Sequence, residues 1–375
     1  MKISILVFDL GRNSIVRTYP IAKVLERRYK VQVIGFYWGR IFDPYRDEFQ
    51  YVARRGGSYP LFAFALRDML RSIKGDVVYA FKPRPTSFGL GLLAKLRRKV
   101  PLVLDIEDWE VGEFLDLPRL SLIKDFFSLW RPNSFVYTYM MERLVGLADK
   151  ITVSSSFLQS RFGGVKLPHG ADENSFNPDR YDRTEIRRKL GIGEDEQIVM
   201  FTGTVNPHKG VDEIARAVKL IGGKARLVVV GGGRNKAYIE RVIRSGGDRV
   251  TFTGYKPHAE MPYYLAAADV VVLPQKSTSF SRAQVPGKIF EAMAMAKPIV
   301  SSPVSDLPEI LDGCGVITEN RKLAEELSYL LSRSDVAAQL GARARERFLR
   351  LYSWGAMEKV LGDVFESFTN RGNEG

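Results

Sequence analysis

Short runs of apolar, mostly β-branched residues alternate with longer amphipathic segments along most of this chain. In the first half the runs are ISILVF, VQVIGF, DVVYAF, PLVLDI and KITVSS, and segments of helical period lie between them, near 17–28, 61–73, 88–98 and 135–147. Strands that are apolar throughout are typical of parallel sheets with helices on both faces, because such a sheet exposes neither face to water. The alternation therefore predicts a doubly wound, Rossmann-like α/β domain over residues 1–170.

The same alternation restarts after the turn-rich stretch GADENSFNPDRYD. The apolar runs are now IVMFTGT, RLVVVGGG, RVTFTGY, DVVVLP and PIVSS, with helical segments beginning near 210, 236 and 288. Because 375 residues exceed what one core usually organises, we predict a second Rossmann-like domain over 171–352, and a C-terminal helix in 353–375 that crosses back to the first domain. Ligands of such sheets bind beyond the carboxyl ends of the strands, so we expect the two domains to face a central cleft.

Cysteine content and hydropathy exclude several classes of protein. The single cysteine, Cys314, has no partner for an intramolecular disulfide, and MKISILVFDL enters a strand pattern without a signal-peptide cleavage site, so we expect a cytoplasmic protein. No apolar run approaches the roughly 18 residues of a membrane-spanning helix. The chain is therefore expected not to span a membrane.

The net charge is +13, and basic residues are frequent in the first hundred positions. They are Arg54, Arg55, Arg67, Arg71, Lys74, Lys82, Arg84, Lys95, Arg97, Arg98 and Lys99. Nucleic acid, an anionic membrane surface or a phosphorylated small molecule would each be attracted to such a field. The alternative is that these side chains are the solvated faces of Lys/Arg-rich helices.

The segment GTVNPHKG, residues 203–210, lies between a predicted strand and a predicted helix. Gly203 allows close backbone approach, the helix start at Gly210 is expected to present unpaired N–H groups, and Lys209 adds a cation. These features favour phosphate binding. The alternative is an ordinary strand-to-helix turn with a lysine that faces solvent.

A second segment, VPGKIFEAMAMAKPIVSS at residues 285–302, opens another predicted helix. Pro286 and Gly287 set a tight turn, Lys288 begins the helix, and Glu291 follows one turn later. A helix start of this kind suits a diphosphate, and the carboxylate suits ribose hydroxyls. The alternative is an i, i+3 charge pair on an exposed helix.

The order of these motifs resembles glycosyltransferase family 4, a class of retaining GT-B enzymes also described as glycosyl transferases group 1. The resemblance rests on ADKITVSSSFLQSRF, LPHGADENSFNP, FTGTVNPHKGVDEIARAV, VTFTGY and PGKIFEAMAMAKPIVSSPVSDLPEIL, which follow one another at the family's spacing across nearly the whole chain. It implies a hexosyl transfer from a UDP- or GDP-linked sugar to an acceptor hydroxyl. By the same resemblance, Lys209 contacts the donor diphosphate during catalysis, Glu291 the ribose, and the backbone around Gly254 and Tyr255 the base.

This sequence departs from the family pattern at two donor positions. Thr204 stands where members often have an arginine, and Ala283 where many have a glutamate eight positions before the one that matches Glu291. Some members share the P-x-K-x-x-E form seen here, so activity is still expected, with the donor sugar left open. Nearby Ser279, Ser281 and Arg282 are candidates for contacts with the diphosphate or the sugar, and Thr204 remains part of the predicted donor site.

Two loops of the first domain are candidates for acceptor binding. Glu107 and Asp108 follow the strand PLVLDI, and members of the family frequently have a histidine where Glu107 stands, so we predict a role for either carboxylate in acceptor binding or proton transfer. The alternative is that they cap the next helix. In LGRNSIVR after the first strand, Gly11 permits close approach, and Arg12 and Arg17 are candidates to hold an anionic acceptor.

Neither a metal site nor a dinucleotide fingerprint is predicted. The three histidines lie far apart in sequence, and no D-x-D triplet occurs, whereas metal-dependent GT-A transferases hold a cation on the diphosphate with such a pair. GLGLLA at residues 89–94 fits a dinucleotide pattern formally, but it follows the third strand and is interpreted as helix packing.

The preferred interpretation is a metal-independent glycosyltransferase of cell-envelope glycan, polysaccharide or glycolipid synthesis. Its expected partners are a nucleotide sugar and a glycan or lipid-linked acceptor, with recruitment to the inner face of an anionic membrane as a hypothesis and no nucleic acid expected. Two alternatives stay open: a non-catalytic protein of the same fold that binds polyanions through the basic first domain, and a sugar-nucleotide epimerase, which would need no acceptor.

Overall fold

A computed structural model describes residues 1–12, 14–42 and 45–369 of the chain. They form two compact units, each described here by itself. Unit 1 contains Met1–His169, Arg282–Gln284 and the C-terminal segment from Met357, and unit 2 contains Gly170–Ser281 and Val285–Ala356. Asn13 of the predicted acceptor loop and residues 370–375 of the predicted C-terminal helix lie outside the described residues.

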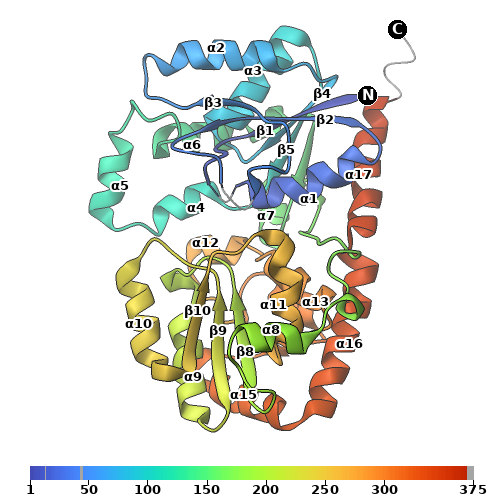
Figure 1. The fold of residues 1–375 in the computed structure, drawn as a ribbon. Helices are drawn as coiled ribbons and strands as arrows, with labels where there is room; N and C mark the ends of the chain where they lie inside the picture. Colours follow the sequence, from blue (N-terminus) through green and yellow to red (C-terminus); the bar gives the residue numbers. More distant parts are fainter. Residues whose placement is uncertain (13, 43–44, 370–375) are drawn as a thin grey trace. The chain divides into compact units, whose positions relative to one another are not determined.

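Unit 1 is built on a parallel sheet (Figure 1). Its strands are β1 (Lys2–Val7), β2 (Lys30–Tyr37), β3 (Val52–Arg55), β4 (Val77–Phe81), β5 (Leu102–Ile106), β6 (Lys150–Val153) and β7 (Val165–Lys166). They lie in the order β3-β2-β1-β4-β5-β6-β7, and every pair is parallel. The doubly wound Rossmann-like sheet predicted from the alternation is thereby confirmed.

Helices connect successive strands of unit 1 and cover the sheet. They are α1 (Ile15–Glu26), α2 (Phe62–Ser72), α3 (Leu90–Arg98), α4 (Glu110–Leu115), α5 (Arg119–Phe126), α6 (Phe135–Arg143) and α7 (Ser156–Phe162). A short π-helical turn (Pro85–Gly89) precedes α3, and a 3₁₀ turn (Val145–Leu147) follows α6. On one face of the sheet, Leu6, Ile34 and Leu104 pack into a core with Phe62 and Met69 of α2.

Unit 2 repeats this architecture. Its strands are β8 (Gln197–Thr202), β9 (Ala225–Val230), β10 (Val250–Gly254), β11 (Val270–Leu273), β12 (Ile299–Ser301) and β13 (Val316–Ile317). They are parallel and lie in the order β10-β9-β8-β11-β12-β13. The strand order therefore changes direction between β1 and β4 in unit 1, and between β8 and β11 in unit 2.

The helices of unit 2 cover both faces of its sheet. They are α8 (Arg183–Lys189), α9 (Val211–Ile221), α10 (Lys236–Gly246), α11 (Met261–Ala267), α12 (Ser279–Ala283), α13 (Lys288–Ala294), α14 (Leu307–Leu311), α15 (Leu323–Ser332) and α16 (Ser334–Leu351), with α12 ending in the segment that belongs to unit 1. Helix α9 shows why such helices form: Val211, Ile214, Ala215 and Val218 recur at helical spacing and are all buried.

The C-terminal helix α17 (Trp354–Thr369) belongs to unit 1 from Met357 onward. Glu358 accepts hydrogen bonds from Arg27 and Arg28 beyond the end of α1, and Lys150 Nζ donates to the Val364 carbonyl at 2.8 Å. The Phe365 ring lies 5.5 Å from that of Tyr79, on the buried strand β4. The last part of the chain is thus attached to the sheet of the first unit by ion pairs and an aromatic contact.

Several elements differ from the sequence predictions. The helix predicted over 135–147 ends at Arg143, and the small elements β3, α4, α5 and α7 were not predicted. Residues 89–94 do serve packing, because a side chain at Gly91 would meet Leu102 of β5 at 2.7 Å. Among the described residues, no helix is both long enough and apolar enough to cross a membrane.

Candidate functional site

In each unit the point where the strand order reverses is the expected place for a ligand, because the chain leaves the two central strands toward opposite faces and opens a crevice at their carboxyl ends. In unit 2 this point lies between β8 and β11. Gly203 follows β8 directly, and Gln275 comes two residues after β11. The residues predicted to bind a phosphate therefore begin at this position.

Lys288 lies against the end of β8. Its Nζ donates a hydrogen bond to the Thr202 carbonyl at 2.7 Å and lies 3.7 Å from the centre of the Phe201 ring. A side chain added at Gly203 would approach this ammonium group to 3.5 Å, so the glycine leaves room beside it. Burial lowers the pKa of Lys288 well below its usual value, and the neighbouring charge of Lys209 lowers it further.

Lys209 approaches the same place from the loop after β8. It ends a 3₁₀ turn (Pro207–Lys209), and its Nζ lies 3.5 Å from Oε1 of the buried Gln275. Lys209 is partly buried, so it is less exposed than the solvent-facing lysine of the alternative interpretation would be. The positive charge of Lys209 thus acts on Lys288, which comes from a segment about 80 residues further along the chain.

Glu291 does not pair with Lys288. Its Oε1 lies 2.9 Å from Nε2 of His258, and the His258 ring lies 5.6 Å from that of Phe176. The exposed i, i+3 charge pair considered from the sequence is therefore wrong: Lys288 is directed at the Thr202 carbonyl and Glu291 at a histidine from a different loop. Pro286 and Gly287 form the first turn of α13, since their carbonyls accept from Ile289 and Phe290.

Glycines line the ends of the next two strands. Gly231 has a φ of +147°, and a side chain there would lie 2.1 Å from the Gly203 carbonyl, so only glycine fits. Gly254 ends β10 with a φ of +73° and forms a bridge to Gly231. The exposed Tyr255 ring covers Gly232, since a side chain there would meet it at 3.2 Å. Gly254 and Tyr255, predicted to contact a base, thus adjoin the glycine-lined strand ends.

The start of α9 differs from the prediction of unpaired N–H groups. The Asp212 N–H donates to the Tyr238 hydroxyl at 3.3 Å, and the Glu213 N–H to the Gly210 carbonyl at 2.9 Å. Both residues are acidic and lie in the first turn, where they compensate the positive end of the helix.

Thr204, Arg282 and Ser281 were also predicted to contact the donor, and they differ in exposure. Thr204 is partly buried directly after Gly203. Arg282 is exposed and belongs to unit 1. Ser281 is fully buried and its hydroxyl donates to the Lys276 carbonyl at 2.6 Å, so its predicted reach toward a ligand is wrong: it closes its own loop.

In unit 1 the corresponding position, between β1 and β4, holds a buried network of charges. Lys82 follows β4 with a φ of +69°, a conformation that is costly for a lysine. Its Nζ pairs with Asp108, with Glu110 Oε1 at 2.9 Å and with Glu107 Oε2 at 3.6 Å. Arg84 pairs with Glu110 and, at 3.2 Å, with Glu113. Lys82 and Arg84 were predicted to belong to the basic surface of the first domain. They are instead buried and form ion pairs.

The pKa values in this network diverge. Burial would lower the pKa of Lys82, but Asp108, Glu110 and Glu107 together raise it well above its usual value. Burial raises the pKa of Glu107 to about 8, with Lys82 opposing and Asp108 adding to the rise. For Glu110, Arg84 and Lys82 outweigh burial and lower the pKa. One carboxyl group of the network therefore holds a proton near neutral pH.

Glu107 and Asp108 are not helix caps. The residue that precedes α4 is Trp109, with no capping side chain, and Asp108 Oδ1 instead accepts from Gln284 Nε2 at 2.9 Å. Glu107 Oε1 lies 3.8 Å from Nε2 of His169, whose pKa is lowered well below its usual value by burial, Arg17 and Lys82. The alternative that these two carboxylates cap the next helix is therefore wrong. Glu107 instead lies beside His169, whose lowered pKa favours the neutral ring.

Gly11, Arg12 and Arg17, which were predicted as candidates for acceptor binding, differ in their contacts. Arg12 is exposed and pairs with Asp9 at 3.2 Å. A side chain at Gly11 would lie 2.9 Å from the Arg40 carbonyl, so this glycine makes room for the protein's own backbone. Arg17 is fully buried and binds Asp105 through two nitrogens, at 3.1 and 2.9 Å. Its predicted contact with an anionic acceptor is therefore wrong.

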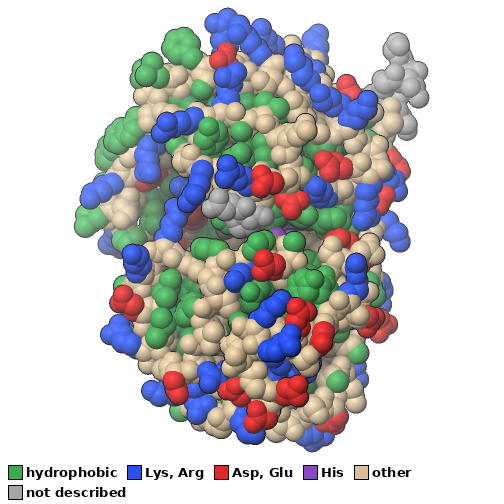
Figure 2. Space-filling model, in the orientation of Figure 1, with side chains coloured by type: hydrophobic (Ala, Val, Ile, Leu, Met, Phe, Trp, Pro, Cys, Tyr) green, Lys and Arg blue, Asp and Glu red, His purple; other side chains and the backbone are tan. Residues whose placement is uncertain are grey.

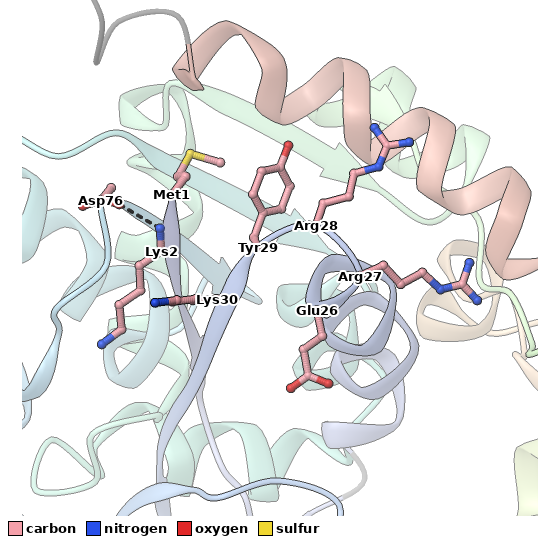
Figure 3. A pocket seen from close by; sticks show the side chains of 8 residues that line it. All are labelled: Met1, Lys2, Glu26, Arg27, Arg28, Tyr29, Lys30 and Asp76. Carbon is pink, nitrogen blue, oxygen red and sulfur yellow. Dashed lines mark hydrogen bonds between the residues drawn. The ribbon is translucent and has the colours of Figure 1, made fainter.

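A pocket at the opposite edge of the unit 1 sheet is less suited to a ligand (Figure 3). It is lined by Met1, Lys2, Glu26, Arg27, Arg28, Tyr29, Lys30 and Asp76. These residues surround the amino ends of β1 and β2, where the Lys2 N–H donates to Asp76 Oδ2 at 2.7 Å. Arg27 and Arg28 point toward α17, where Glu358 binds both, so the arginines attach that helix.

Sequence reasoning did not identify several residues of these two places. In unit 2 they are Gly231, His258 and Gln275, and in unit 1 Glu110 and His169. The glycine run after RLVVV and the acid-rich DIEDWEVGE were visible signals. His258, His169 and Gln275 gave no such signal, because their partners come from distant segments.

Part of the second unit is similar to a known family. Residues 196–333 match the model of the family described as Glycosyl transferases group 1. A GDP-mannose-dependent alpha-(1-6)-phosphatidylinositol monomannoside mannosyltransferase of Mycobacterium tuberculosis is 29% identical over 60% of this chain and 63% of its own length. A D-inositol 3-phosphate glycosyltransferase of Xylanimonas cellulosilytica is 30% identical over 55% of this chain and 51% of its own length. The matches thus span less than two thirds of these relatives.

A solved structure agrees with the fold over nearly the whole chain. HepE of Anabaena in complex with UDP-glucose superposes with a TM-score of 0.76, covering 98% of this chain and 100% of its own, at 17% identity. At that identity the likeness shows the fold alone, which is the GT-B architecture of two Rossmann-like units. The matched residues of the second unit are thus similar to the group 1 glycosyl transferases, and the chain shares the GT-B fold.

Proposed function

We propose that this chain is a retaining glycosyltransferase that moves a hexosyl residue from a nucleoside-diphosphate sugar to an acceptor hydroxyl. The observation that carries the proposal is the pair Lys209 and Lys288 where the strand order of unit 2 reverses: Lys288 Nζ donates to the Thr202 carbonyl beside Gly203, and Lys209 acts on it electrostatically. Such a pair of cations suits a diphosphate, because one phosphate charge alone would leave the other lysine uncompensated.

The other predicted donor residues fit around a diphosphate at this position. Glu291 would accept hydrogen bonds from ribose hydroxyls, with His258 holding its carboxylate. The base would lie against Gly254 and Tyr255, with the ring of Tyr255 over Gly232. The Mycobacterium relative is GDP-mannose-dependent and the Anabaena structure contains UDP-glucose, which supports a UDP- or GDP-linked hexose as donor.

The proposed chemistry depends on stabilising the leaving nucleoside diphosphate. As the anomeric C–O bond breaks, negative charge grows on the diphosphate, and Lys209 and Lys288 would stabilise it in place of a metal ion. The acceptor hydroxyl would attack the same face of the sugar, with a phosphate oxygen of the leaving group taking its proton, which gives retention. Glu107 and Asp108 of unit 1 would orient the acceptor through hydrogen bonds.

We further propose a glycan or lipid-linked acceptor of cell-envelope synthesis. The relatives named above act on a phosphatidylinositol monomannoside and on inositol 3-phosphate, both phosphorylated hydroxyl acceptors. The exposed cation of Arg12 would contact such a phosphate. The enzyme would then work at the inner face of a membrane, on an acceptor anchored there.

The test is sugar transfer by wild type and Lys209→Ala. We expect Lys209→Ala to lower kcat by about a hundredfold or more, because removal of one group that stabilises transition-state charge costs a few kcal/mol. Lys219→Ala, an exposed lysine at the other end of α9, is the matched control and should keep full activity. Unchanged turnover in Lys209→Ala would refute the assignment.

Product analysis separates the proposal from its alternatives. NMR of the anomeric proton should show the configuration of the donor preserved in the product, whereas inversion would contradict the retaining mechanism. Sugar-nucleotide conversion without any acceptor would indicate an epimerase. No turnover together with polyanion binding that Lys209→Ala leaves unchanged would indicate a non-catalytic protein.

A further inference from the structure

Thr202, the last residue of β8, has a buried hydroxyl group without a hydrogen-bond partner. The residue is 3% exposed, and its Oγ1 forms no hydrogen bond to any residue that the structure describes. A buried hydroxyl group normally pairs with protein, water or ligand, because leaving it unpaired lowers the stability of the fold. Valine has nearly the same shape and would avoid this cost, so the hydroxyl group of Thr202 points to a role other than packing.

The side chain of Thr202 lies on the face of the sheet that α13 covers. Phe201 packs into a core with residues of α9, whereas Met200 packs into a core with residues of α13. Because successive side chains of a strand point to opposite faces, the side chain of Thr202 lies on the same face as that of Met200. Helix α13 is the element that supplies Lys288 and Glu291 to the candidate site.

The strands of unit 2 separate beside this residue on one side only. Toward β9 the pairing continues to the end of β8, with Thr202 opposite Val230. Toward β11 the pairing ends two residues earlier, with Met200 opposite Val271. This divergence lies where the strand order changes direction, which is where a crevice for a ligand is expected. Lys288 Nζ donates to the Thr202 carbonyl at this point, at 2.7 Å.

A hydroxyl group and an ammonium group at one residue supply several hydrogen-bond donors to one ligand. The hydroxyl group of Thr202 has one O–H, and the Lys288 ammonium group has three N–H donors, of which the Thr202 carbonyl takes one. Phosphate oxygens accept such bonds, and bonds to a charged acceptor are the stronger kind. The charge of Lys209 also acts on Lys288, so an anion is favoured here over a neutral ligand.

We propose that Thr202 is a donor-binding residue whose hydroxyl group donates a hydrogen bond to a phosphate oxygen of the nucleoside diphosphate. This inference rests on the proposed function, because it requires a diphosphate beside Lys288. The hydroxyl group is paired only in the complex, so binding supplies a hydrogen bond that the free protein lacks. Thr202 thus adds to the two lysines a contact that carries no charge.

Thr202→Val tests the proposal, because valine removes the hydroxyl group and keeps the net charge. We expect two changes of opposite sign. The Tm of the free protein rises by about 2–4 °C, because an unpaired buried group is removed. The Kd for the nucleoside diphosphate rises about tenfold or more, because a hydrogen bond to a charged acceptor is lost. Thr202→Ser keeps a hydroxyl group and should bind as wild type does. Thermal unfolding and titration calorimetry measure the two quantities.

Ser134→Ala is the matched control. Ser134 of unit 1 is 1% exposed, and its hydroxyl group also has no hydrogen-bond partner among the described residues. Its removal should leave the Kd unchanged. Neither substitution alters net charge, which matters because Lys and Arg side chains are spread over the visible surface of both units and attract anions without specificity (Figure 2).

Inorganic pyrophosphate is the second probe, since it has neither base nor ribose. Thr202→Val should weaken its binding by the same factor as that of the nucleoside diphosphate. A Thr202→Val variant that binds the nucleoside diphosphate as tightly as wild type would overturn this inference alone. A lower Tm with an unchanged Kd would do the same, because the hydroxyl group would then pair inside the protein. Absence of nucleotide binding by wild type would instead refute the proposed function, and this inference with it.

Discussion

At the residue scale, Glu107 is an acid whose surroundings favour its protonated form. Burial raises its pKa to about 8, and Lys82 only partly opposes the rise. In the unfolded chain the carboxyl group titrates near its usual value of 4.5, so the folded state binds an extra proton between these two pH values. Its contribution to stability is complete below the unfolded pKa and is lost as pH rises through the folded pKa.

We therefore predict that the free energy of unfolding falls between about pH 5 and pH 8, and that Glu107→Gln removes part of this fall, because the amide needs no proton. Urea unfolding at several pH values in this window is the measurement. Glu240→Gln, which removes an exposed carboxylate of α10, is the control and should keep the wild-type slope. The same slope in Glu107→Gln and wild type would show that Glu107 does not carry the extra proton.

Lys288 gives a second prediction, on ligand binding. Burial and Lys209 hold the pKa of Lys288 well below its usual value, with Glu291 partly opposing them. A bound diphosphate would favour the charged ammonium group and raise this pKa, so binding should take up a proton and weaken as pH rises. Calorimetry in buffers of different ionisation enthalpy measures the uptake. Lys288→Met should abolish it, and an uptake of the same size in that variant would exclude Lys288 as its source.

The parts of the site that the sequence could predict are those held within one segment. Gly203 and Lys209 share a loop, and Lys288 and Glu291 share a helix turn, so short motifs place them. The Lys82 network instead depends on the pairing of β4 with β5, where Phe81 lies opposite Asp105. A single sequence does not give the order of strands, so neither this network nor the burial of Arg17 beside Asp105 could be foreseen.

At the scale of elements, Gly210 joins the loop after β8 to the start of α9. Gly210 has a φ of +64°, and a side chain there would lie 2.2 Å from the Pro274 carbonyl. Gly191, in the turn after α8, has a similar φ of +65° with open space around it. Gly191→Ala should cost about 1 kcal/mol for the positive φ alone.

We predict that Gly210→Ala costs more, on the order of 2–4 kcal/mol, because the new methyl group also displaces the strand-end backbone after β11. Chemical denaturation of both variants measures the difference, and Gly191→Ala serves as the control for the cost of the positive φ. Equal losses in the two variants would mean that the Pro274 carbonyl moves away freely.

The long apolar strands and amphipathic helices were predictable because burial on both faces of a parallel sheet leaves a clear pattern. The elements that were missed lack such a pattern. VARR in β3 is short and half-basic, as an edge strand allows, and α5 turns its apolar stripe outward instead of toward a core. The predicted end of the helix over 135–147 was wrong because the helix stops before Gly146, a residue that favours chain ends over helix interiors.

At the scale of the whole molecule, the two units share a sheet topology but place different charged residues after their strands. Unit 2 presents Lys209 and Lys288, and unit 1 presents Glu107, Asp108 and Glu110 around one lysine. In the proposed transfer, unit 2 would hold the leaving diphosphate and unit 1 the acceptor hydroxyl.

The central claim is that unit 2 binds a nucleoside diphosphate through Lys209, and thermal unfolding of the full chain with a panel of nucleoside diphosphates tests it most directly. A ligand at about a hundred times its Kd adds about 2.7 kcal/mol of stability. We predict that one base raises the Tm selectively, that Lys209→Ala loses the shift, and that Lys219→Ala keeps it. No shift with any nucleotide, or a shift that Lys209→Ala retains, would contradict the account.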